Sequence, residues 1–172
     1  MSKELIAVIA EGESERAVID VLLDHEALTF DRREMLQEEI ITTRKGANFA
    51  KMYLNKSFSV PIKIIRILDS RKENFKLPKV YQRKISEINN VTTRPEIEIL
   101  YIIYHNDFQY YTNGNNDKPS KYVRSHYKDL EHVKTYEDNY QFWDNHFDDL
   151  IKALKQYKSY HKKELAIADL LK

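Results

Sequence analysis

The 172-residue chain lacks cysteine altogether, has only three glycines and contains no long apolar run. Without cysteine it can form neither disulfides nor thiolate zinc sites, and it has no cysteine nucleophile. Its apolar segments are too short to cross a bilayer, and no secretory leader is visible. We therefore expect a cytoplasmic protein with no membrane partner.

The chain also lacks an excess of one charge. Lys and Arg number 28 and Asp and Glu number 27, which gives a net charge of +1. No basic field covers the whole molecule, so contact with nucleic acid has to come from a local patch. The length predicts a single domain over residues 1–172, with enough sequence for one core.

Strand-like and helix-like segments alternate in the first half of the chain. Residues 4–10 predict a buried strand and residues 13–24 an amphipathic helix. A second strand is predicted over 39–43, a short helix over 47–55, and the strongest strand over 60–69. This alternation predicts an α/β fold with a mostly parallel sheet flanked by helices.

The second half has weaker signals. Residues 80–90 are expected to be helical or irregular, and the apolar run 97–104 fits either a strand or a buried helix. Turn-forming residues predict a loop over 112–120. One long helix is predicted over 138–158, within a helical C-terminal extension (130–172) packed on the domain.

Carboxylates follow the two strongest strands. Glu11 comes directly after the first strand, Glu15 lies one helical turn further, and Asp69 ends the strand over 60–69. If these strands are parallel neighbours, the side chains meet at one edge of the sheet. Hard oxygen ligands there would suit Mg²⁺, an ion that activates water and polarises phosphoryl groups. Helix-start and turn roles for the same carboxylates remain open alternatives.

Three segments resemble motifs of a known family. Residues 8–15 (V-I-A-E-G-E-S-E) resemble the first motif of TOPRIM domains, especially in overcoming-lysogenization-defect nucleases. The strand ending at Asp69 resembles the second motif, D-x-D, with Arg71 at the second aspartate position. Residues 94–100 are similar to the proline-and-glutamate segment of RloB-type proteins, small TOPRIM-like proteins associated with phage defence. The resemblance covers roughly residues 4–125.

The resemblance implies a compact TOPRIM-like, Rossmann-like domain that holds Mg²⁺ or Mn²⁺ and cuts nucleic acid. Such a protein would be a metal-dependent phosphodiester hydrolase in defence against phages or mobile elements, with nucleic acid and a partner protein of the defence system as binding partners. The metal ligands carried over are Glu11, Glu15, Asp69 and Glu98. For Glu98 an alternative stays open, a buried structural carboxylate paired with an arginine such as Arg94 or Arg66.

Basic residues supply the remaining candidates. With Glu11 and Asp69 as catalytic carboxylates, Arg71 and Lys72 beside them would stabilise charge on the phosphoryl group. A helix after the predicted loop would carry a basic stripe, which suits phosphate binding but is also typical of a solvated face. The candidates for nucleic-acid contact are Arg44, Lys45, Lys118, Lys121 and Arg124.

Two other functions remain open. Arg71 in place of the second aspartate is compatible with a catalytically degenerate TOPRIM-like module that binds or scaffolds. An RNA-processing nuclease would use the same chemistry, and the sequence does not choose between RNA and DNA. Assembly into a homo-oligomer is also left open.

Overall fold

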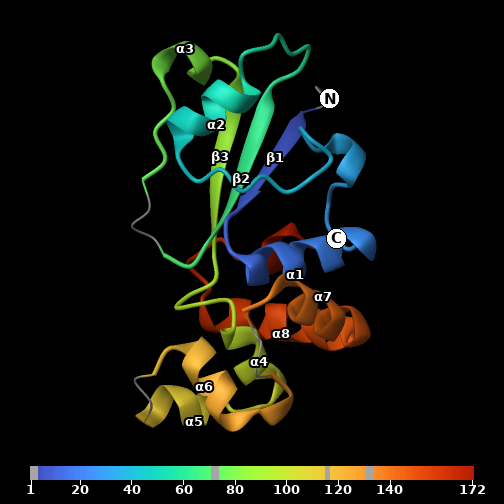
Figure 1. The fold of residues 1–172 in the computed structure, drawn as a ribbon, viewed down its shortest axis with the longest axis vertical. Coiled ribbons are helices and arrows are strands. Elements are labelled where there is room, and N and C mark those ends of the chain that lie inside the picture. The colour runs from blue at the N-terminus through green and yellow to red at the C-terminus, as the bar shows by residue number, and fades with distance from the viewer. Residues whose placement is uncertain (1–3, 71–73, 115–116, 131–133) are drawn as a thin grey trace.

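The structure is a computed structural model that describes residues 4–70, 74–114, 117–130 and 134–172. Three parallel strands, β1 (Leu5–Ala10), β2 (Ile62–Leu68) and β3 (Ile85–Thr92), form an open sheet in the order β1-β2-β3. Figure 1 shows α4 to α8 gathered beyond the C-terminal ends of the strands. The predicted α/β class is confirmed.

Helices make up most of the remaining regular structure. The α-helices are α1 (Glu13–Asp24), α2 (Gly46–Tyr53), α3 (Lys79–Gln82), α4 (Ile99–Tyr104), α5 (Phe108–Gly114), α6 (Pro119–His126), α7 (Tyr136–Asn145) and α8 (Phe147–Tyr160). Short 3₁₀ turns are η1 (Arg32–Glu34), η2 (Lys128–Leu130) and η3 (Ile167–Leu170).

The sheet separates two apolar clusters. Alternate side chains of a strand point to opposite faces, and β1 and β2 are apolar on both. Val8 and Ile65 belong to the large cluster, which includes residues of α1, α4, α7 and α8. Ala7 and Ile64 belong to the smaller cluster, which includes residues of α2. A parallel sheet buried on both faces is the arrangement that continuous apolar strands require.

Two predictions for the sheet are wrong. Residues 39–43 form no strand, because only Ile41 bridges to β1 and Glu38 has a positive φ of 57° that interrupts extended backbone. Of residues 80–90, which are expected to be helical or irregular, 80–82 do lie in the helix α3, but 85–90 belong to β3. The apolar residues of β3 recur every third position, which resembles helical spacing, and a register irregularity opposite Ile62 accommodates this pattern.

The helical half also differs in detail. The buried segment within 97–104 is the helix α4, which settles the open alternative. The predicted loop over 112–120 is shorter, since α5 reaches Gly114 and α6 starts at Pro119. The helix predicted over 138–158 is two helices, because the backbone of His146 (φ −122°, ψ 40°) ends α7 and begins α8.

The C-terminal helices complete the core. α7 packs on α1 and α8 packs on α4. Trp143 of α7 is fully buried and its ring stacks on Tyr101 of α4 at a centroid distance of 4.7 Å. In the described part of the chain, no helix has both the length and the apolar character to span a membrane.

The start of α2 depends on a glycine for space. A Cβ atom on Gly46 would lie 2.3 Å from the backbone oxygen of Lys76. We expect Gly46→Ala to lower the free energy of unfolding by about 2 kcal/mol, because backbone has to shift to admit the methyl group. Urea denaturation followed by circular dichroism measures this change.

The matched control is Gly114→Ala, since a Cβ at Gly114 meets no atom within 4 Å. It should leave the denaturation midpoint unchanged or slightly raised. Equal midpoints for the two variants would show that the close approach at Gly46 carries no cost.

Candidate functional site

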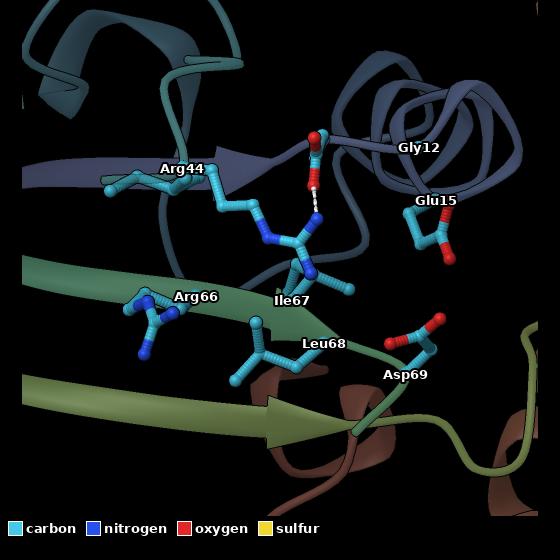
Figure 2. Close-up of a pocket in the computed structure, with 9 residues that line it drawn as sticks. Gly12, Glu15, Arg44, Arg66, Ile67, Leu68 and Asp69 are labelled. Carbon is cyan, nitrogen blue, oxygen red and sulfur yellow. Dashed lines mark ion pairs between the residues drawn. The ribbon is translucent and has the colours of Figure 1, made fainter. Parts of the chain in front are cut away.

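A pocket of about 220 Å³ lies at the C-terminal ends of β1 and β2. Carboxylates, two arginines and apolar strand residues surround it (Figure 2). Its lining residues are Ile9, Glu11, Gly12, Glu15, Arg44, Arg66, Ile67, Leu68 and Asp69. Ligand sites of open parallel sheets are found at this edge.

Strand pairing brings the carboxylates together. Ala10 of β1 pairs with Ile67 of β2 in a parallel register, so the residues that follow both strands leave the sheet on the same side. Glu11 directly follows β1 and Asp69 directly follows β2. Figure 2 shows the carboxylates of Glu15 and Asp69 facing one another from α1 and from the end of β2.

Gly12 makes room for Glu15. A Cβ on Gly12 would lie 1.8 Å from a carboxylate oxygen of Glu15, so the glutamate side chain folds back over the glycine. Gly12 has an ordinary extended backbone (φ −74°, ψ 145°), which any residue could adopt. A larger residue at this position would therefore compete with the Glu15 carboxylate for space.

Glu15 has a raised pKa. Burial, with smaller contributions from the charges of Glu98 and Asp69, raises the pKa of Glu15 from 4.5 to about 7. Lys134 opposes this rise. A buried carboxylate beside other carboxylates is destabilised in its charged form, and a bound cation would relieve that cost.

Arginines occupy the pocket together with the carboxylates. Arg44 pairs with Glu11 through an Nη1–Oε2 contact of 2.9 Å. Arg66, in the middle of β2, is 2% exposed, donates to the Asn90 side chain and lies over the Phe75 ring. The sequence contains a signal for Arg66, since a charged residue inside an apolar strand is unusual, but a pattern of acidic ligands does not include it.

Glu98 lies behind the pocket rather than in its lining. Its carboxylate is buried and accepts a hydrogen bond of 2.9 Å from the Ser14 hydroxyl in the first turn of α1. Burial raises the pKa of Glu98. Of the two arginines that the sequence offers as partners for Glu98, Arg94 pairs with Glu164 and Arg66 donates to Asn90.

A buried polar network extends from Glu98 into the C-terminal helices. Asn139 of α7 donates to the Ser14 hydroxyl at 3.3 Å and accepts from the Tyr101 hydroxyl at 2.7 Å. Ser14 and Asn139 are both almost fully buried. Isolated polar residues on apolar helix faces do not predict this network, because their partners come from distant parts of the chain.

The remaining sequence candidates that the structure describes do not line the pocket. Arg71 and Lys72 fall outside the described residues. Lys45 is exposed, precedes α2 and does not line the pocket. The basic residues of α6 and its flank are also exposed and do not line the pocket, and Figure 1 shows α6 at the end of the molecule away from the sheet. They are Lys118, Lys121, which pairs with Asp117, and Arg124, which donates to the backbone of Ser120.

The donor set fits a hard divalent cation. Glu11, Glu15 and Asp69 offer carboxylate oxygens, and Mg²⁺ in proteins often takes only one or two carboxylates together with water and phosphate oxygens. Within the described ranges, no group of three or more acidic or histidine side chains is already arranged as a ligand set. Glu11, engaged by Arg44, would have to exchange partners to bind an ion.

The raised pKa of Glu15 predicts a pH-dependent stability in metal-free buffer. Because the folded state raises this pKa above its unfolded value, stability from the protonated carboxyl is full below about pH 4.5 and is lost as the pH rises to about 7. Glu15→Gln removes the titration. The variant should exceed the parent in unfolding free energy by roughly 2 to 3 kcal/mol at alkaline pH and by little near pH 5.

Urea denaturation at several pH values with a chelator present measures this difference. Glu13→Gln is the matched control, because Glu13 lies in the same helical turn but is 52% exposed. If the difference in unfolding free energy between Glu15→Gln and the parent does not grow with pH, the raised pKa of Glu15 is contradicted.

Comparisons with known proteins identify no relative of this chain. No family model, no curated protein and no solved structure matches the chain. The arrangement of the pocket and its chemistry are therefore what support a function.

Proposed function

We propose that the protein is a metal-dependent phosphodiester hydrolase of TOPRIM-like type that acts on nucleic acid. One observation carries the proposal. The ends of two neighbouring parallel strands and the first turn of α1 place Glu11, Asp69 and Glu15 around one pocket that also contains Arg44 and Arg66. Carboxylates beside guanidinium groups suit a divalent cation bound next to a phosphate.

Each pocket residue has a role in this proposal. Glu11, Asp69 and Glu15 would hold Mg²⁺ or Mn²⁺, which when bound would polarise the phosphoryl group and lower the pKa of an attacking water. The carboxylates of Asp69 and Glu15 face one another in the pocket, so both can offer oxygens to the same ion. Arg44 and Arg66 would bind phosphate oxygens and stabilise their charge.

Glu98 supports the site from behind in this proposal. Its hydrogen bond to Ser14 fixes the first turn of α1, the turn that carries Glu15. The Ser14 hydroxyl in turn accepts from Asn139 of α7. Glu98 is therefore assigned as a positioning residue for Glu15 rather than as a ligand that contacts the ion.

The biological setting rests on the sequence resemblance. Similarity to RloB-type and overcoming-lysogenization-defect proteins supports action on phage or mobile-element nucleic acid in the cytoplasm. The order of the three motifs along the chain, rather than any one motif, gives this resemblance its weight. A partner protein of a defence system is part of the same proposal.

Neutralising the carboxylates should abolish cleavage. We expect Glu11→Gln and Asp69→Asn each to lower the Mn²⁺-dependent cutting rate of plasmid DNA or of structured RNA at least about 100-fold, because each removes a ligand charge. Gel assays with both substrates measure this loss. Glu13→Gln changes an exposed carboxylate of the same helical turn as Glu15 that does not line the pocket, so this variant should cut like the parent. Equal cutting by all variants would refute the proposal.

Divalent ions should stabilise the folded protein. An ion that binds only the folded state at about 100 times its Kd adds about 2.7 kcal/mol, equivalent to a Tm rise of roughly 5 to 10 °C for a chain of this size. Differential scanning fluorimetry with Mn²⁺ or Mg²⁺ measures the shift, with KCl at matched ionic strength as control. Asp69→Asn should lose the shift, and a parent that shows none would contradict the metal site.

A further inference from the structure

Arg44 is the pocket residue whose present partner conflicts with the proposed function. Its Nη1 contacts Oε2 of Glu11 at 2.9 Å, so the guanidinium occupies the carboxylate that would hold the ion. Both side chains are 55% exposed. Exposed ion pairs contribute little to stability, so breaking this one costs the fold little.

The backbone beneath Arg44 is held in place while the tip of the side chain is exposed. Arg44 lies two residues before α2, and Gly46 at the start of α2 packs against the backbone of Lys76. The neighbouring Ile41 is hydrogen-bonded to β1 on both sides, from its N–H to Val8 and from Ala10 to its carbonyl. The guanidinium can therefore change partner by side-chain rotation, with no movement of the sheet or of α2.

The same pocket offers the Arg44 guanidinium a second position, near Arg66. Arg66 lines this pocket too, on the strand next to β1, and is almost completely buried. Burial, and to a smaller extent the charge of Arg44, lowers the pKa of Arg66, so the two guanidinium groups act on each other. An anion near both would replace this repulsion with attraction, and arginines match the two-oxygen geometry of a phosphate.

We propose that Arg44 is an exchange residue, which pairs with Glu11 in the absence of metal and moves to a substrate phosphate when a divalent cation takes its place. This inference rests on the proposed function and deepens it. Metal and phosphate then bind cooperatively, because the ion releases the guanidinium that the phosphate needs. By linkage, the phosphate must raise the affinity for the ion by the same factor.

The experiment measures Mn²⁺ affinity by electron paramagnetic resonance, with and without deoxythymidine monophosphate. This probe offers a phosphate group but has no phosphodiester bond to cut. For the parent we expect the nucleotide to tighten Mn²⁺ binding several-fold. Arg44→Gln alone should bind Mn²⁺ about 2- to 5-fold more tightly than the parent, because the guanidinium no longer competes with the ion for Glu11. The free energy of an exposed ion pair corresponds to a factor of this size. The nucleotide should no longer tighten Mn²⁺ binding to this variant.

Lys51→Gln is the matched control. It makes the same change in net charge at an exposed position of α2 that does not line the pocket, and this variant should behave like the parent. Equal tightening by both variants would assign the effect to net charge and overturn the exchange. Unchanged or weaker Mn²⁺ binding by Arg44→Gln would overturn it too, while the proposed function stands as long as the parent binds Mn²⁺ and Glu11→Gln does not. Absence of Mn²⁺ binding by the parent would overturn both.

Discussion

The parallel pairing of β1 with β2 is the constraint on which the candidate site depends. The register that sets Ala10 opposite Ile67 makes both strands end at one edge, with an acidic residue directly after each. A shift of one residue would turn every side chain of a strand to the other face and would disrupt the packing of both apolar clusters. Much of the energy that places the carboxylates therefore comes from the aliphatic packing of β1 and β2 in the two apolar clusters.

Helices distant in sequence hold the rest of the site. Ser14 in the first turn of α1 is bonded to Glu98 at the start of α4 and to Asn139 of α7. Such a network is costly if one member loses its partner, because the remaining groups are buried without compensation. The C-terminal helices thus contribute more than a cover for the core, since they fix the turn that orients Glu15.

Local patterns were enough to find what depends on neighbours in sequence. The strands before Glu11 and Asp69, the helix α1 and the α/β class followed from apolar runs and their spacing. Partners far apart in the sequence were not predictable in this way. The hydrogen bond from Ser14 to Glu98, the ion pair of Arg44 with Glu11 and the burial of Arg66 depend on tertiary packing. β3 was missed because an edge strand with polar residues on both faces has no clear two-residue alternation.

The two bridges that join Met35 and Ile41 to the outer side of β1 have a consequence for how the molecule meets others of its kind. They satisfy backbone groups on that border, which would otherwise be a template for a foreign strand. β3 forms the opposite border and carries the exposed charged residue Glu87, whose side chain pairs with Lys63 of β2. The protein's own backbone pairs with one border, and the other border carries charge. This combination disfavours aggregation through sheet extension.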